Sequence, residues 1–309
     1  MSISFEQLKQ DVLQNFGEDE LFKTSVLKSP KVWETDLYKF CAKMPKGADL
    51  HSHGGAMIPA KELIKFVASN DNLVVDTDHE HKGYVCLTDK DHTDTYMPLQ
   101  EALDKNLFSE QELIKCWTLI GCPAGTDVWD WFQELFEKHN DLNEVGPTCK
   151  DYFKYSYEYY CRHNIFHIEQ RLFLKNSEEE AFAKAHCAFD AYMEAKEKYP
   201  DLTVKIIPVG LKHPAFGKDV TENIFHNAAV MNKKIKDGDE DFVVGIDLVN
   251  EEDSSRSIRD FEELIKRTLK EAPSLNVNLH AGETRKKDND EIKAAIDMGS
   301  KRIGHGLNL

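Results

Sequence analysis

The sequence is short of positive charge and of long apolar runs, and each shortage argues against a class of partner. Its 309 residues include 39 Lys and Arg against 55 Asp and Glu, which gives a formal net charge of −16. Binding to a nucleic-acid backbone or to an anionic membrane surface requires clusters of positive charge, so neither is expected as a partner. No apolar run reaches the ~20 residues of a membrane-spanning helix, and no basic and then apolar leader opens the chain.

Paired cysteines are also missing. The seven Cys residues are odd in number and contain no C-x-x-C pair. This pattern is typical of a reducing compartment rather than of a disulfide framework, and with the missing leader it predicts a cytoplasmic protein. A content of 41% hydrophobic and 30% charged residues is typical of a globular chain. A small neutral or cationic molecule is therefore the kind of partner that the composition leaves, and the oligomeric state stays open.

Short apolar runs of strand length alternate with helix-like segments. The runs are residues 47–53, 165–174, 202–211, 241–249, 275–282 and 301–306. Several are almost wholly apolar or β-branched, as expected for parallel strands buried on both faces. The alternation predicts an α/β fold, either a (β/α) barrel or an open doubly wound sheet.

The segments between these runs predict helices. Residues 177–200 begin with a Ser-x-x-Glu capping box and end at Pro200. The apolar face of this helix is expected to consist of Phe182, Phe189 and Met193. Residues 257–273 show a helical apolar stripe, and residues 289–300 end at Gly299, a natural residue after a helix end.

The regions outside this alternation suggest a division of the chain. Residues 1–43 precede the first strand and are expected to form an N-terminal helical segment. Residues 44–309 are expected to form the barrel domain. Within it, residues 54–164 are too long for one crossover and read as an insertion of polar loops and a Trp-rich helix. An insertion after a strand's carboxyl end is where lids and substrate walls are usually found.

Polar side chains suited to chemistry stand at the ends of four of the predicted strands. They are His51 and His53, Asp247 to Asn250, His280 with Glu283, and His305. In a (β/α) barrel the carboxyl ends of the strands surround one pocket, so these groups would meet. Neutral imidazoles can hold Zn²⁺, while a further Glu or His can move protons or orient water. Each motif taken alone also fits ordinary polar residues at a strand end.

Four motifs, taken in order, resemble the adenosine deaminase family. They are "MPKGADLHSHGGA", "VVGIDL", "NLHAGE" and "RIGHG", and the "MPKG" lead-in is similar to the branch related to adenosine-deaminase growth factors. The resemblance runs from about residue 44 to the last residue. It implies a TIM (β/α)8-type barrel, of which this chain contains about six βα units.

The resemblance also implies roles for single residues. His51, His53 and His280 would hold one zinc ion per active site. Glu283 would protonate the purine ring, and it should therefore have a raised pKa. His305 would orient and deprotonate the attacking water. Asn250 and Gly282 would contact the substrate.

The implied activity is zinc-dependent hydrolytic deamination of a purine nucleoside, adenosine or deoxyadenosine, with release of ammonia. Two departures from the family pattern bear on the substrate: Gly54-Gly55-Ala56 follows the second His where an acidic residue would meet the ribose, and Asn250 replaces a Gly. A third bears on the metal, because the sequence stops after the sixth strand, before the family's fourth ligand. We expect a fragment. The alternatives are an amidohydrolase for another aminated purine and a non-catalytic relative that binds ligand without turnover.

Other patterns have plainer interpretations. "HIE" at 167–169 resembles half of a cytidine deaminase signature but lacks its P-C-x-x-C, so His167 is expected to belong to a strand. His79, His81 and His92 are expected in a solvated loop, and the acidic run at 250–255 at a helix start. Cys161 and Cys187 are expected to pack in the core. Core packing is also expected for Trp129, Trp131 and Phe132, although these aromatic side chains could instead stack on a purine.

Overall fold

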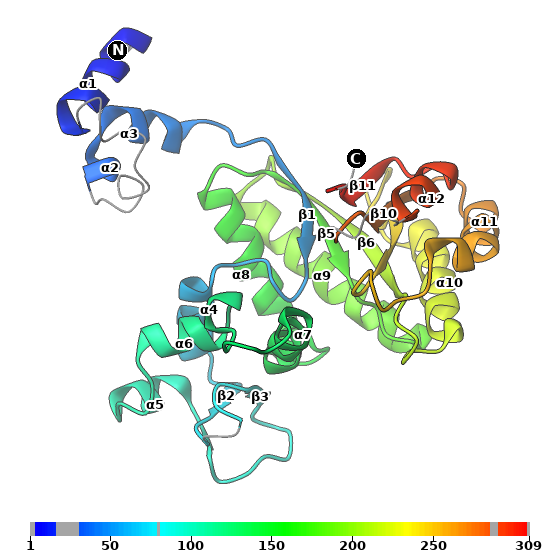
Figure 1. The fold of residues 1–309 in the computed structure, drawn as a ribbon, viewed down its shortest axis with the longest axis horizontal. Coiled ribbons are helices and arrows are strands. Elements are labelled where there is room, and N and C mark those ends of the chain that lie inside the picture. The colour runs from blue at the N-terminus through cyan, green and yellow to red at the C-terminus, as the bar shows by residue number, and fades with distance from the viewer. Residues whose placement is uncertain (1–3, 17–30, 79–80, 285–289, 308–309) are drawn as a thin grey trace.

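The computed structural model describes residues 4–78, 81–284 and 290–307 of the chain, apart from 17–30. Its centre is a six-stranded parallel sheet, and within this sheet the strands lie side by side in the order in which they occur in the sequence (Figure 1). The strands are β1 (Ala48–His53), β5 (His167–Leu172), β6 (Thr203–Leu211), β9 (Gly245–Val249), β10 (Asn276–Ala281) and β11 (Arg302–His305). All six predicted strands are confirmed, and the sequential parallel order is that of a (β/α) barrel.

The sheet curls until its first and last strands approach each other. The guanidinium of Arg302 on β11 lies 3.5 Å from the carbonyl oxygen of Leu50 on β1. The rings of His51 and His305, one on each of these strands, have centroids 5.3 Å apart. In the described part of the chain no ladder of hydrogen bonds joins β1 to β11. The barrel is therefore nearly closed by six strands.

Helices connect the strands as predicted. The crossovers are α8 (Cys149–Arg162) before β5, α9 (Glu178–Lys198), α10 (Lys218–Lys234), α11 (Glu262–Glu271) and α12 (Glu291–Asp297). A 3₁₀ turn at Ile258–Phe261 precedes α11, and a small hairpin, β7 (Lys236–Asp237) with β8 (Glu240–Asp241), precedes β9. Gly299 follows α12 with a φ of +76°, as its position in the sequence predicts. Gly210 on β6 lets α10 pack closely, because an added Cβ would lie 2.4 Å from Thr221 Cγ2.

The buried face of α9 differs from the predicted one. The predicted capping residue is confirmed, since the Ser177 side chain accepts the N–H of Glu180. However, Met193 is 39% exposed, and Phe182 and Phe189 are only partly buried. The helix instead buries a row of alanines, together with the larger Lys184 and Tyr192. The alanines are Ala181, Ala185, Ala188, Ala191 and Ala195. Alanines allow the helix to lie close to its neighbours, α8 above all, which the hydrophobic pattern alone does not predict.

The insertion between β1 and β5 contains more regular structure than the sequence suggested. The polar loops expected at residues 74–96 include an antiparallel sheet of β2 (Leu73–Asp76), β3 (Val85–Leu87) and β4 (Tyr96–Met97). The strands are too short for a periodic pattern to reveal them. Its helices are α4 (Ala60–Ala68), α5 (Leu99–Asp104), α6 (Glu110–Cys116) and the Trp-rich α7 (Val128–His139), with 3₁₀ turns at Leu119–Gly121 and Asn140–Asn143.

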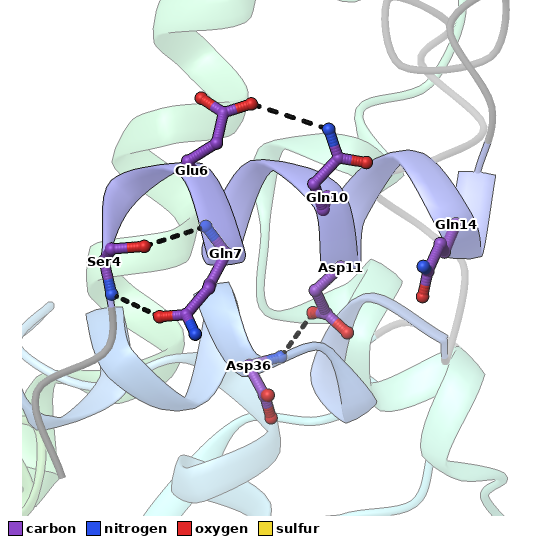
Figure 2. Close-up of a pocket in the computed structure, with 7 residues that line it drawn as sticks. All are labelled: Ser4, Glu6, Gln7, Gln10, Asp11, Gln14 and Asp36. Atoms are coloured by element: carbon purple, nitrogen blue, oxygen red, sulfur yellow. Dashed lines mark hydrogen bonds between the residues drawn. The ribbon is translucent and has the colours of Figure 1, made fainter.

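Three N-terminal helices lie to one side of the barrel (Figure 1). They are α1 (Phe5–Phe16), α2 (Lys31–Glu34) and α3 (Asp36–Lys43). An exposed polar hollow beside α1, shown in Figure 2, is lined by Ser4, Glu6, Gln7, Gln10, Asp11, Gln14 and Asp36. Asp11 Oδ2 accepts the backbone N–H of Asp36 at 2.6 Å, so the hollow marks the contact of α1 with α3.

No helix in the described ranges is both long and apolar enough to cross a bilayer.

Candidate functional site

Three histidines from two distant strands converge at the carboxyl ends of the sheet. His51 and His53 stand two residues apart at the end of β1, and His280 comes near the end of β10. Their Nε2 atoms lie 3.0 Å apart for His51 and His280, 3.3 Å for His51 and His53, and 3.2 Å for His53 and His280. Among the residues that the structure describes, these three histidines form the one group of at least three potential ligands close enough together to hold a metal ion.

The spacing of the three nitrogens fits a metal ion at their centre. Two nitrogens bound to one tetrahedral zinc at ~2.0–2.1 Å lie about 3.3–3.4 Å apart, close to the separations found here. Three unprotonated nitrogens that face each other at this distance would repel one another without a cation between them. The side chains therefore fit a metal of the kind that imidazoles prefer, among which zinc is common.

Burial keeps the two β1 histidines neutral. Burial, with smaller contributions from Arg171 and His280, lowers the pKa of His51 to about 3. It lowers the pKa of His53 to about 3 as well, with His280 as the largest charge contribution. A neutral imidazole offers a lone pair, so both side chains are ready to act as ligands near pH 7.

A buried carboxylate orients the third histidine. Asp247 on β9 is fully buried, and its Oδ2 lies 2.9 Å from His280 Nδ1 while its Oδ1 accepts the backbone N–H of His280 at 2.9 Å. Arg171 on β5 pairs with the same carboxylate at 3.1 Å and also donates to the carbonyl of Leu50. Burial opposes the charge on Asp247, but His280 and Arg171 hold its pKa below the ordinary value. Donation of an Nδ1 proton to Asp247 would leave Nε2 of His280 free to bind a metal ion.

Glu283 and His305 meet beside the three histidines. Glu283 Oε1 lies 3.4 Å from His305 Nε2, and the rings of His305 and His280 have centroids 5.1 Å apart. Burial raises the pKa of Glu283 against the charges of His280 and Lys212, which is the direction predicted from the sequence. Burial also lowers the pKa of His305, and the neighbouring His280 adds to the effect. Both pKa shifts are in the direction that favours the uncharged form of the side chain.

Glycines in two of the motifs make room for this arrangement. A Cβ on Gly304 would lie 2.8 Å from His51 Cε1, so only Gly at this position leaves room for the His51 ring where it now lies. Gly282 has a φ of +67°, and its N–H donates to Glu252 at 3.0 Å while its carbonyl accepts the N–H of Leu307 at 2.8 Å. Both of its backbone groups are therefore engaged within the protein.

Asn250 follows β9 in a backbone conformation that favours glycine. Its φ is +97°, and its side-chain Oδ1 accepts the N–H of His213 at 3.3 Å. The side chain is thus directed to the end of β6. Its own backbone N–H donates to no group among the described residues.

The acidic run at 250–255 was interpreted wrongly, because the helix begins later, at the Ile258 turn. Glu252 is instead buried, with 8% of its surface exposed, and its carboxylate accepts the backbone N–H groups of Gly282, Glu283 and Thr284. The sequence carries no signal for this contact, because a carboxylate that reaches another loop leaves no periodic or spacing pattern. Arg171 was missed for the same reason.

The other plainer interpretations agree with the structure where it describes the residues. His167 opens β5 at the opposite end of the strand and lies 2.6 Å from Thr203 Oγ1. His81 and His92 are exposed, and His79 lies outside the described residues. Cys161 is in the core and Cys187 packs against it. Within α7, Trp129 contacts Phe132, and Trp131 donates to the carbonyl of Thr118, which supports helix packing for these aromatic residues.

Fold and site together define a (β/α) barrel with a three-histidine candidate metal centre at the carboxyl ends of its strands. Solved structures agree on the fold. An Arabidopsis N6-mAMP deaminase superposes with a TM-score of 0.53 at 16% identity, covering 88% of this chain and 68% of that one. A Burkholderia ambifaria amidohydrolase with bound Zn does so with a TM-score of 0.50 at 14% identity, covering 89% and 62%.

Curated sequences give a more particular likeness. Adenosine deaminase 2 of Dictyostelium discoideum is 25% identical over 298 residues, 89% of this chain and 54% of that protein. Adenosine deaminase 2-A of Danio rerio is 23% identical over 310 residues, 89% of this chain and 58% of that protein. No family model matches the sequence. The predicted resemblance to the adenosine deaminase family is confirmed, and the chain spans about half the length of these relatives.

Proposed function

We propose that the protein is a zinc-dependent hydrolase that deaminates a purine nucleoside. The observation that carries the proposal is the convergence of three imidazole nitrogens within 3.3 Å of one another, beside a paired Glu and His. His51, His53 and His280 would hold one zinc ion. Bound zinc would supply Lewis-acid chemistry that makes water a nucleophile near neutral pH.

The two groups beside the ligands are suited to move the protons of the reaction. Hydrolytic deamination forms a C6–O bond, breaks the C6–N bond and releases ammonia. Glu283, whose pKa is raised by burial, would give a proton to the purine ring nitrogen next to C6. His305, whose pKa is lowered, would be neutral and would take the proton of the attacking water. The 3.4 Å separation of the two side chains supports assigning them to the same reaction centre as acid and base.

The substrate would contact backbone rather than charged side chains near β1 and β9. The N–H of Asn250 is available to a ring nitrogen, and we assign it to the base. Gly282 would provide clearance instead of a hydrogen bond, because both of its backbone groups are engaged. Gly54-Gly55-Ala56 offers no carboxylate to a ribose, which keeps the related alternative of another aminated purine open. One structural neighbour is named as an N6-mAMP deaminase and another is a complex with IMP, which supports including nucleotides in a test.

The test is metal analysis combined with an amine-release assay. The full-length protein is purified, its zinc content is measured, and release of ammonia or methylamine is scored with adenosine, deoxyadenosine, adenine, AMP and N6-methyl-AMP. We expect about one zinc per site, activity on at least one of these compounds, and its loss and return on chelation and zinc addition. Zinc-loaded full-length protein that binds a purine but releases no amine would indicate the non-catalytic relative instead.

Substitution of Glu283 by Gln tests its role separately from the metal. The amide cannot donate a carboxylic proton, so kcat should fall at least ~100-fold, the range attributed to general acid–base catalysis. Zinc content should stay at the wild-type value, because the ligands are untouched. Glu263→Gln, at a side chain that is 89% exposed on α11, is the matched control. Loss of zinc together with activity would show that Glu283 serves the metal site.

A further inference from the structure

The loop after β10 carries Glu283, the proposed general acid, and the carboxylate of Glu252 holds this loop. The chain leaves β10 at Ala281 and turns through Gly282, Glu283 and Thr284 without forming a helix or a strand. Three successive backbone N–H groups therefore lack the acceptors that regular structure would provide. Buried N–H groups without an acceptor are costly, so the loop needs a partner from elsewhere.

Glu252 supplies all three acceptors. Its Oε1 accepts the N–H of Gly282 at 3.0 Å, and its Oε2 accepts the N–H groups of Glu283 at 2.5 Å and Thr284 at 3.3 Å. The neighbouring Asp253 accepts the hydroxyl of Thr284 at 2.9 Å. A charged acceptor strengthens each of these hydrogen bonds, and the low exposure of Glu252 shields them from water.

The contact fixes the backbone from which Glu283 projects. The held residues include Glu283 itself and both of its neighbours, so the Cα of Glu283 cannot shift without breaking at least one bond. The glycine before it is in the left-handed region, and a Cβ there would lie 2.5 Å from Ile292 Cδ1. The loop is thus confined by packing on one side and by Glu252 on the other.

We propose that Glu252 is a positioning residue that holds the Glu283 loop in the geometry needed for proton transfer. The inference rests on the proposed function for its catalytic meaning. Glu252 acts through the backbone of its three partners and does not touch the substrate. Small misplacements of a catalytic group cost orders of magnitude in rate, so the contact should matter mainly for kcat.

The test compares Glu252→Gln with the adjacent Glu251→Gln. Gln keeps the size of the side chain but has one acceptor oxygen, and its NH₂ group would face the N–H groups that the second oxygen now accepts. Glu251 carries the same charge, and its carboxylate accepts the hydroxyl of Ser254 at 2.6 Å. Steady-state kinetics, zinc content and amide hydrogen exchange of peptides covering 282–284 are measured on full-length, zinc-loaded protein.

For Glu252→Gln we expect kcat to fall about 100-fold, KM to stay within about threefold, and exchange at 282–284 to become faster. Zinc content should not change, and Glu251→Gln should match the wild type. Glu252→Asp, which keeps both oxygens on a shorter stem, should recover part of the lost kcat. The same comparison is made with Glu252→Asp alone if the Gln variant does not fold.

Unchanged kcat and unchanged exchange in Glu252→Gln would overturn the proposal. So would a parallel loss of zinc in both Glu252 variants, because Glu252 would then serve the ligand His280 rather than Glu283. If the wild type acts on no purine, the proposed function fails, and amide exchange alone decides whether Glu252 holds the loop.

Discussion

At the scale of single residues, the absence of a side chain at Gly304 leaves the space that the His51 ring occupies. Gly304→Ala would put a methyl group 2.8 Å from His51 Cε1 and 3.4 Å from His51 Nδ1, with the backbone of β10 at His280 Cα 3.5 Å away. We expect the His51 ring to be displaced and zinc affinity to fall roughly 10–100-fold, as for changes that disturb ligand orientation. Competition with a chromophoric chelator measures this affinity.

The control for this substitution is Gly146→Ala. A Cβ at Gly146 would meet Leu87 Cδ1 at an ordinary 3.6 Å, so affinity should not change. Equal zinc affinities in the two variants would mean that the ring of His51 can move without loss, and that the three nitrogens are less preorganised than their spacing suggests.

At the scale of secondary-structure elements, α9 shows how close packing depends on small side chains. Ala188 lies in the middle of the buried row, and Met193 lies on the other side of the helix with 39% of its surface exposed. Ala188→Leu should overpack the contact and lower the free energy of unfolding by about 1–3 kcal/mol. Met193→Leu, a substitution of similar volume, should change it by less than about 0.5 kcal/mol. Urea unfolding of both variants checks this, and a neutral Ala188→Leu would show that the row is loosely packed.

The same helix marks what the sequence could predict. The six strands were predictable because short runs of strand length, several of them almost wholly apolar, alternate with helix-like segments. The convergence of the polar groups was predictable because they follow strand ends that a barrel brings together. The Ser177 cap was predictable because capping is local. The buried face of α9 was not, since it depends on how closely its neighbours approach. Glu252 and Arg171 act across loops and strands, and such contacts leave no mark in local sequence. The division at residue 43 stays a prediction.

At the scale of the whole molecule, the site draws on strands that are far apart in the chain. Its groups come from β1, β5, β9, β10 and β11, and β1 is separated from β5 by the long insertion. His51 and His53 lie on one edge strand and His305 on the other, while Arg171, Asp247 and His280 lie on strands between them. An ion bound only by the folded state would stabilise the entire sheet, because its ligands come together only when the strands are in register.

The metal-free protein should accordingly lose stability in weak acid. The pKa of His51, His53 and His139 is lowered to about 3, with burial as the largest cause in each. Below the unfolded value of 6.5 the unfolded chain binds protons that the folded chain does not, so stability falls as pH drops from 7. Urea unfolding at about pH 7, 6 and 5 measures the slope, above the range in which most carboxylates titrate.

His53→Asn should flatten that slope, because it removes one of the groups that the folded state keeps neutral. His163→Asn, at an exposed histidine after α8, should leave the slope as it is. A wild-type slope that is flat from pH 7 to 5 would mean that the folded state accommodates protons on its histidines. The three nitrogens would then have to separate when protonated, and their close spacing would be a property of the neutral state alone.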